Sequence, residues 1–253
     1  MKMLRTLKVN KLVAHIVCGS PNLWLPTTLT GYIVGVDRGA LKLIEKHFDF
    51  DAAIGDFDSV SKKQRQLIKD KVKNMLELPA NKDLTDCEAA VEYVVSKGYR
   101  EIHLYGTTGL RFDHQFATLS LMLKYAKRDV QIYMEDAQNK ISILEAGVHQ
   151  IQVENVHRIV GAATHCAGGK RTAHSEEAGI SHRVKIDTKN YISFFALENT
   201  AKNLILQGVK YPLDGYDLAI DNSLCISNEA IDATVNVSFD SGYLLVVQSS
   251  DLI

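Results

Sequence analysis

The sequence contains no long hydrophobic run and no excess of charge of either sign. Its 253 residues include 29 basic and 30 acidic side chains, which gives a formal net charge of −1. A basic surface that attracts nucleic acid is therefore not expected. The longest apolar runs, such as 243–247, fall far short of the roughly 20 residues that span a bilayer, and the N-terminal segment lacks the apolar core of a signal peptide. We expect neither nucleic acid nor a membrane as a partner.

Cysteine is scarce and widely spaced. The four cysteines stand at positions 18, 87, 166 and 225, without a C-x-x-C pair for metal or redox chemistry. A chain of this length can build its own hydrophobic core and does not need disulfide bonds for stability. We therefore expect free thiols and a reducing, cytoplasmic location.

The most familiar nucleotide-binding and hydrolase motifs are also absent. The patterns G-x-x-x-x-G-K-[ST], G-x-G-x-x-G, H-E-x-x-H and G-x-S-x-G do not occur. If the protein handles nucleotide phosphates, it must use a carboxylate-bound metal and separate basic side chains instead of a P-loop.

Residues 1–138 alternate between short apolar segments and amphipathic helical patterns. Strands are predicted at 12–18, 32–36, 51–54, 74–78, 100–105 and 130–135, and helices at 41–48, 61–72, 85–97 and 113–127. Strands that alternate with helices of this length indicate crossover connections and a mostly parallel sheet flanked by helices. We expect an α/β domain here.

Residues 139–253 show strand patterns without a convincing helix. The candidate strands are ISIL, HQIQVEN, NYISFFAL, NLILQGV, SLCIS, TVNVSF and GYLLVVQS, with AG, DG and SG as turn signals between them. This organisation predicts an all-β domain of the β-sandwich type. The stretch 161–183 is rich in Gly, Ala, His and Ser and has no period, so it is expected to be a loop insertion; its histidines match no zinc-site spacing.

Acidic residues gather where predicted strands end. Four aspartates follow the strands of the first domain: Asp37, Asp56, Asp58 and Asp86. The carboxyl ends of parallel strands meet at one edge of a sheet, so these side chains are expected to approach one another. Clustered carboxylates repel unless a cation lies between them, and Mg²⁺ prefers oxygen ligands. The alternative is that each aspartate serves only as a helix cap or turn residue.

Two local patterns refine this prediction. If the segment around Asp56 and Asp58 is extended, both carboxylates face the same side while Phe57 faces the core. Thr85 and Glu88 form a capping-box pattern, which predicts a helix with Asp86 in its first turn.

Basic residues near the same loops are suited to phosphate. Lys82 stands just outside the predicted cap, and Arg111 follows the GTTG segment 106–109, whose backbone amides could hold phosphate. The alternatives are a solvated surface lysine for Lys82, a helix N-cap for Asp113 and a surface histidine for His114.

Taken in order, VDRGA (36–40), IGDFDS (54–59), KDLTD (82–86) and GTTGLRFDH (106–114) resemble the thiamine pyrophosphokinases, especially the bacterial type. GVKYPL and ISNEA, further along, resemble the thiamine-binding β-domain of that family. The resemblance implies an α/β domain followed by a β-sandwich and a homodimer with thiamine bound at the subunit interface. It also implies Mg²⁺-dependent transfer of pyrophosphate from ATP to thiamine, with AMP as the second product.

The resemblance also implies roles for individual residues. The metal set is Asp37, Asp56, Asp58 and Asp86, and the catalytic set is Asp58, Asp86, Arg111 and Asp113. The contacts to nucleotide, phosphate or thiamine, which overlap with these sets, are Asp37, Lys82, Asp83, Thr85, Arg111, His114, Ser227 and Asn228. Asp86 is the first choice as proton acceptor, and either Asp58→Asn or Asp86→Asn is expected to lower kcat strongly. For Ser227 and Asn228 the alternative is a polar turn between strands.

The sequence departs from the family pattern at three places. The stretch 161–183 is longer than the connection expected in this family. The only tryptophan, Trp24, lies in the loop after the first predicted strand and not in the second domain. The usual ADGG string reads VDRG, which places Arg38 next to Asp37. Two other functions stay open: a metal-dependent phosphohydrolase, which would form AMP without thiamine, and a sensor that binds ligands without turnover.

Overall fold

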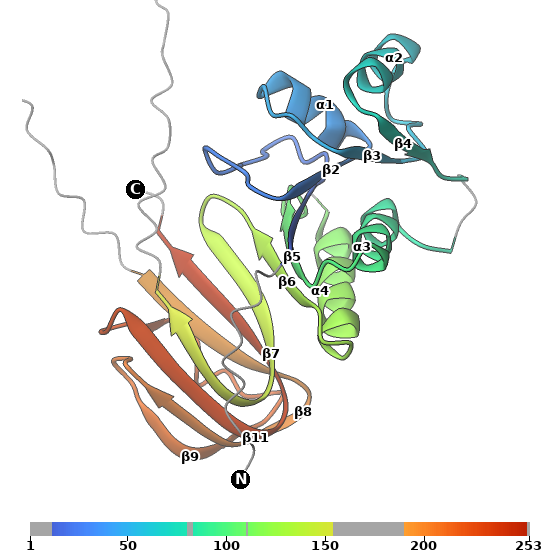
Figure 1. Cartoon of the computed structure of the whole chain (residues 1–253). Coiled ribbons are helices and arrows are strands. Elements are labelled where there is room, and N and C mark those ends of the chain that lie inside the picture. Colours follow the sequence, from blue (N-terminus) through green and yellow to red (C-terminus); the bar gives the residue numbers. More distant parts are fainter. Residues whose placement is uncertain (1–11, 80–82, 110, 154–189, 252–253) are drawn as a thin grey trace, which may run out of the picture.

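The computed structural model describes residues 12–79, 83–109, 111–153 and 190–251. These form a helix-flanked α/β region followed by a region of long antiparallel strands (Figure 1). The predicted combination of α/β and all-β architecture is confirmed. The segment 161–183, which was predicted to be a loop insertion, lies outside the described residues.

Six parallel strands form the sheet of the first region. They are β1 (Val13–Val17), β2 (Tyr32–Val36), β3 (Ala52–Gly55), β4 (Asn74–Glu77), β5 (Glu101–Tyr105) and β6 (Gln131–Glu135). Their order in the sheet is β6-β5-β1-β2-β3-β4, with every neighbouring pair parallel. All six predicted strands are confirmed to within one or two residues.

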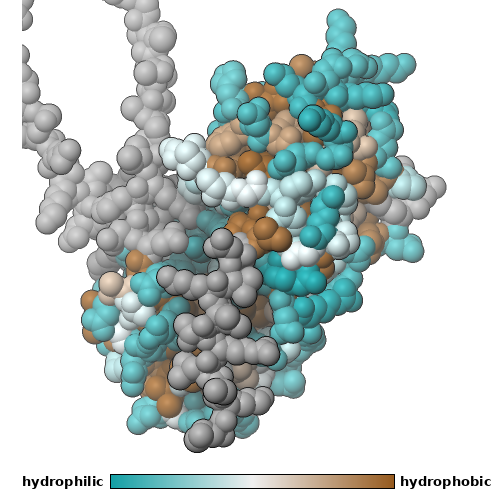
Figure 2. Space-filling view, viewed as in Figure 1, coloured by the Kyte–Doolittle hydropathy of each residue, from teal (hydrophilic) through white to brown (hydrophobic). Residues whose placement is uncertain are grey.

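Helices cover both faces of this sheet. They are α1 (Arg38–Glu45), α2 (Lys62–Lys71), α3 (Asp86–Ser96) and α4 (Phe112–Ala126). Helices α3 and α4 bury Val91 and Met122 against alternate strand residues such as Ile16, while α1 buries Leu43 against the opposite face. Helix α2 buries only Ile68, and hydrophilic side chains cover its outer surface in Figure 2.

The helix starts follow local sequence chemistry, with three corrections. Helix α1 begins at Arg38, three residues before its predicted start. Thr85 accepts a hydrogen bond from the Glu88 amide (3.2 Å), as predicted, but the Glu88 carboxylate pairs with Lys124 on α4 (2.6 Å). The N-cap position of α4 is Arg111, so the interpretation of Asp113 as its N-cap is wrong. Within the part of the chain described, no helix is long and apolar enough to cross a membrane.

Three long strands dominate the second region. They are β7 (Asn139–Gln152), β8 (Asn190–Gln207) and β11 (Thr234–Ser250), accompanied by β9 (Leu213–Leu218) and β10 (Asn228–Glu229). The order is β10-β8-β11-β7, all antiparallel, and β9 pairs with β8. Phe194, Leu204 and Val237 are among the side chains of its separate core.

Three sequence predictions for this region are corrected. Neighbouring predicted strands merge, so that TVNVSF and GYLLVVQS form one strand with an irregularity between Phe239 and Tyr243. SLCIS forms turns and not a strand, and the DG taken as a turn signal lies inside β9. Gly215 supplies the positive φ (69°) that this strand needs.

The two regions share one continuous sheet. Strand β6 pairs antiparallel with β7 through Tyr133↔Ser142, Met134↔Ile141 and Glu135↔Lys140. The turn between them is closed by Asp136, whose Oδ1 accepts the amides of Gln138 and Asn139 at 2.8 Å. The change from parallel to antiparallel pairing thus falls near residue 138, while the division into two domains at that residue stays a prediction.

Candidate functional site

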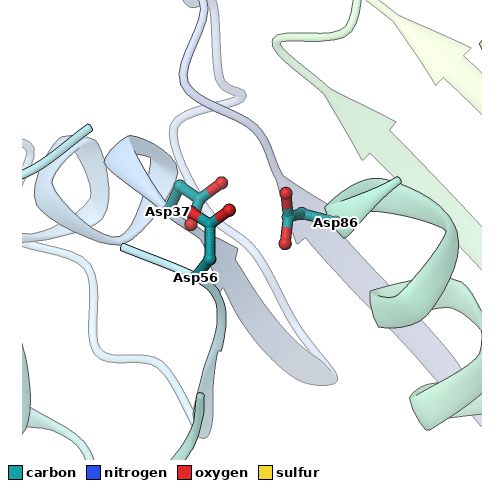
Figure 3. Close-up of side chains that lie close together, drawn as sticks. All are labelled: Asp37, Asp56 and Asp86. Atoms are coloured by element: carbon teal, nitrogen blue, oxygen red, sulfur yellow. The ribbon is translucent and has the colours of Figure 1, made fainter. Parts of the chain in front are cut away.

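Three carboxylates from separate segments converge at the carboxyl edge of the parallel strands. Asp37 follows β2, Asp56 follows β3 and Asp86 begins α3 (Figure 3). One oxygen from each lies within 4.8 Å of the others, and all three residues are half-buried. We call these residues the acidic trio. Carboxylates this close repel one another unless a cation compensates them, and the all-oxygen donor set suits Mg²⁺.

The backbone around Asp37 is shaped to present its carboxylate to the trio. Asp37 has a φ of 46°, an unusual value for a residue other than glycine, and its side chain does not cap α1. Its Oδ1 instead accepts the amide of Phe57 (3.1 Å). Gly55 makes room for this arrangement, because a Cβ there would lie 1.8 Å from the same oxygen. Strained backbone of this kind costs about 1–3 kcal/mol and concentrates at functional sites.

The segment after β3 is turned and not extended. Phe57 has a φ of 56° and is only 3% exposed, so its predicted core-facing orientation is confirmed. Asp56 Oδ1 accepts the amide of Asp58 (3.1 Å), which closes a turn. The extended conformation on which Asp56 and Asp58 would face the same side is therefore absent, and Asp58 is exposed and is not part of the trio among the residues described. Its role as a ligand stays a prediction.

Close backbone contacts hold the surrounding loops together. A Cβ on Gly39 would lie 1.9 Å from the carbonyl oxygen of Val17, and one on Gly106 would lie 2.4 Å from that of Cys18. The Ser20 hydroxyl donates to the carbonyl of Thr108 (3.1 Å). The loops after β1, β2 and β5 thus form one packed edge, in which glycine permits the close approach.

Arg111 and Asp113 form a two-pronged ion pair at the start of α4. Arg111 Nε and Nη2 lie 3.1 and 2.5 Å from the two oxygens of Asp113. The side chains are 69% and 61% exposed, so the pair is accessible from solvent. Hydrogen bonding to Asp113 raises the pKa of Arg111, and the Arg111 guanidinium lowers the pKa of the Asp113 carboxyl. A phosphate that binds the Arg111 guanidinium must compete with Asp113 for its Nε and Nη2 donors.

The other residues predicted to bind ligands at this edge are Lys82, Asp83, Thr85 and His114. Thr85 caps α3, while Asp83 and His114 are exposed. Lys82 lies outside the described residues.

Two cysteines next to the trio were not singled out by sequence reasoning. The pKa of the Cys18 thiol is raised by a hydrogen bond with Cys87, by burial and by the nearby charges of Asp37 and Asp86. Both thiols are free, as is that of Cys225, which confirms the expectation for the cysteines described.

Ser227 and Asn228 lie in the second region, on β10 and the turn before it. Asn228 is 4% exposed, its Oδ1 accepts the amides of Tyr211 and Glu229 (3.0 Å each), and its Nδ2 donates to the Tyr211 carbonyl (2.8 Å). The amide of Ser227 donates to Ser193 Oγ (2.9 Å), while its own side chain is exposed. Asn228 is therefore a strand residue held by hydrogen bonds to Tyr211 and Glu229, and Ser227 lies in the turn before it. Contact of either residue with thiamine stays a prediction, and β10 lies at the opposite end of the strand order from β4.

A row of polar side chains lies on β1, β5 and β6, and sequence reasoning missed it. His103 Nδ1 lies 2.5 Å from the Glu135 carboxylate, and its ring stacks on Tyr133. His15 is 7% exposed, and its Nε2 lies 3.1 Å from the Thr30 carbonyl. Burial is the main reason that the pKa of His15 is lowered from 6.5. Polar residues at alternate positions in EIHLY were the available signal.

Comparison with known proteins adds independent evidence. Residues 26–134 match the model of the thiamin pyrophosphokinase catalytic domain, and residues 180–244 match that of the thiamin pyrophosphokinase vitamin B1 binding domain. Thiamine pyrophosphokinase of Bacillus subtilis is 30% identical over 243 residues, which cover 94% of this chain and 98% of that protein.

Solved structures agree with these matches. The crystal structure of thiamine pyrophosphokinase from Bacillus subtilis has a TM-score of 0.76 at 28% identity, covering 95% of this chain and 100% of that one. A thiamin pyrophosphokinase family protein from Enterococcus faecalis has a TM-score of 0.74 at 29% identity, with coverage of 95% and 99%. Yeast thiamin pyrophosphokinase, at 10% identity, has the same fold, with a TM-score of 0.69 and coverage of 96% and 87%. With a 30% identical relative aligned along nearly its whole length and both domain models matched, this chain belongs to the thiamin pyrophosphokinase family.

Proposed function

We propose that this protein transfers the pyrophosphoryl group of ATP to thiamine in a Mg²⁺-dependent reaction. The hydroxyl oxygen of thiamine forms a bond to the β-phosphorus of ATP, and the bond from that phosphorus to the α,β-bridging oxygen breaks. AMP leaves with the bridging oxygen, the hydroxyl proton passes to a base, and thiamine diphosphate is the second product.

The acidic trio is the observation that carries this proposal. Asp37, Asp56 and Asp86 provide carboxylate oxygens from three segments at the edge of a parallel sheet where ligands bind. We propose that these three residues hold Mg²⁺, with Asp58 as a further candidate on the rim. When bound there, Mg²⁺ would neutralise phosphate charge and orient the phosphate oxygens.

Transfer of this type requires mainly positioning and neutralisation of charge from the protein. Arg111 would bind a phosphate oxygen after exchanging its contact with Asp113, and Lys82 would add a second positive charge. Asp83, Thr85 and His114 stay candidates for contacts to the nucleotide. Asp86 stays our first choice as acceptor of the hydroxyl proton.

We further propose that the active unit is a homodimer with thiamine bound between subunits. Ser227, the proposed thiamine contact, lies on the turn before β10, far along the strand order from the trio. Large apolar side chains near this turn are exposed, among them Tyr211, Leu224, Ile226 and Ile231. A second copy that covers them would bring Ser227 to the trio of its partner. The free thiols of the described cysteines fit the cytoplasmic location that we propose.

One assay tests the reaction. Purified protein is incubated with ATP, and AMP and thiamine diphosphate are quantified with and without thiamine and with and without Mg²⁺. We expect both products in equal amounts, and only when thiamine and Mg²⁺ are both present. AMP formed without thiamine would favour a phosphohydrolase, and thiamine binding without either product would favour a sensor. Light scattering coupled to gel filtration tests the dimer.

A further inference from the structure

We propose that Arg38 binds a phosphate group of the nucleotide directly, in addition to the contribution of the metal. The proposal rests on the function proposed above, because it assigns a residue to the nucleotide side of the same site. Neither the sequence motif nor the trio assigns Arg38 a role.

The position of Arg38 is fixed by the packed edge. It is the first residue of α1 and directly follows Asp37 of the trio. A Cβ on Gly19 would lie 2.8 Å from the Cβ of Arg38, so the loop after β1 presses against the base of its side chain. Gly39, the next residue, is buried against the carbonyl of Val17. The backbone that carries Arg38 is therefore held against the end of β1 and the loop after it.

The guanidinium end of Arg38 is available for a ligand. The residue is exposed, and its side chain forms no ion pair or hydrogen bond with any residue that the structure describes. In this respect Arg38 differs from Arg111, whose fork is already occupied by Asp113. It also differs from Lys42 on the same helix, which pairs with Glu45 at 2.8 Å.

The charge balance of the site gives Arg38 a function. Three carboxylates next to a triphosphate place far more negative charge at this edge than one divalent cation can compensate. Arginine is suited to the remaining charge, because its planar group donates two parallel hydrogen bonds to phosphate oxygens and stays protonated. A cation next to Asp37 without a bound anion would instead weaken metal binding. A phosphate group that binds both the metal at the trio and the Arg38 guanidinium would balance these charges.

The test compares Arg38→Gln and Arg38→Lys with Lys42→Gln, which removes one positive charge from the same helix one turn away. The probe is α,β-methylene-ATP, whose α,β bridge is not cleaved, and its Kd is measured by calorimetry with Mg²⁺ and again with EDTA. We expect Arg38→Gln to weaken binding about 10- to 100-fold in both conditions, Arg38→Lys to weaken it less, and Lys42→Gln to change it less than about twofold.

Steady-state kinetics give a second measurement. Arg38→Gln should raise KM for ATP and leave KM for thiamine unchanged. The inference is overturned if Arg38→Gln binds the analogue as the unaltered protein does, if its effect disappears in EDTA, or if Lys42→Gln has the same effect. Failure of the proposed function looks different, because the unaltered protein would then form no thiamine diphosphate from ATP at all.

Discussion

The two regions of the molecule position their candidate ligand-binding residues by different means. At the edge of the parallel sheet, the trio is placed by close contacts between backbones, at Gly39, Gly55 and Gly106. In the antiparallel region, the turn that carries Ser227 is held by side-chain hydrogen bonds from Asn228 and Ser193. The first site should therefore be sensitive to added atoms, and the second to removed hydrogen-bonding groups.

The contrast extends to what each region leaves accessible. The trio is half-buried and anionic, whereas the exposed side chains near the β10 turn are large and apolar. A metal and a polyphosphate fit the first environment, and a heterocyclic ring or a second subunit fits the other. The predictions below test this division.

The largest expected effect is on catalysis at the trio. Asp86→Asn should lower kcat about 10²- to 10³-fold at saturating Mg²⁺, because the site loses one of the charges that hold the cation. Product assays measure this effect. Asp58→Asn is the comparison, and an equal loss there would place Asp58 in the metal set after all.

The next largest effect should come from adding one methyl group next to Asp37. Gly55→Ala places a Cβ 1.8 Å from Asp37 Oδ1 at a φ of 153°, and should cost about 2–4 kcal/mol of unfolding free energy. Gly98→Ala is the matched control, because Gly98 also has a positive φ (94°) but no atom within 4 Å of an added Cβ. Its cost should be about 1–2 kcal/mol by urea unfolding. Equal costs would mean that the packed edge is not tight.

In the antiparallel region, the loss of stability caused by a substitution should depend on how many side-chain hydrogen bonds it removes. Asn228→Ala leaves the part-buried amide and carbonyl of Tyr211 without their partner and should cost about 1–3 kcal/mol. Ser227→Ala should change stability by less than about 0.5 kcal/mol, because the hydroxyl is exposed and only the backbone amide is bonded. If Ser227 contacts thiamine, this variant raises KM for thiamine at unchanged melting temperature. A KM unaffected by Ser227→Ala removes the residue from the thiamine site.

The smallest effect is a pH dependence from His15. Because burial lowers the pKa of His15 from 6.5, the unfolded chain takes up a proton there at a higher pH than the folded protein does. The free energy of unfolding should therefore be fully retained above pH 6.5 and fall as the pH drops below it. Urea unfolding at pH 7.5 and 5.5 should show a smaller decrease for His15→Gln than for the unaltered protein. Parallel pH profiles for the two proteins would contradict this assignment.

The sequence alone was sufficient to predict the α/β region, because each of its units is local. A strand, a loop and a helix succeed one another within about 30 residues, and the hydrophobic period identifies each. The convergence of Asp37, Asp56 and Asp86 followed from topology, since the carboxyl ends of parallel strands share an edge.

The remaining features depend on contacts between distant residues. Whether Asp58 joins the trio is decided by the positive φ of Phe57, which no spacing reveals. The fusion of short candidate strands into β8 and β11 depends on long-range antiparallel pairing. The hydrogen bonds that hold the Asn228 side chain depend on Tyr211, which is 17 residues away. The polar row around His15 and His103 is assembled across three strands, and its local trace in the sequence is the alternation of polar residues in EIHLY.

The ladder that joins β6 to β7 has a mechanical consequence. Backbone hydrogen bonds cross the junction between the two regions, and only the short turn at Asp136 separates the paired strands. A swing of one lobe about a flexible tether, which encloses substrates in many two-lobed enzymes, would require this ladder to break. We therefore expect the two regions to move as one rigid body. A substrate would then be enclosed by surface loops or by a neighbouring subunit.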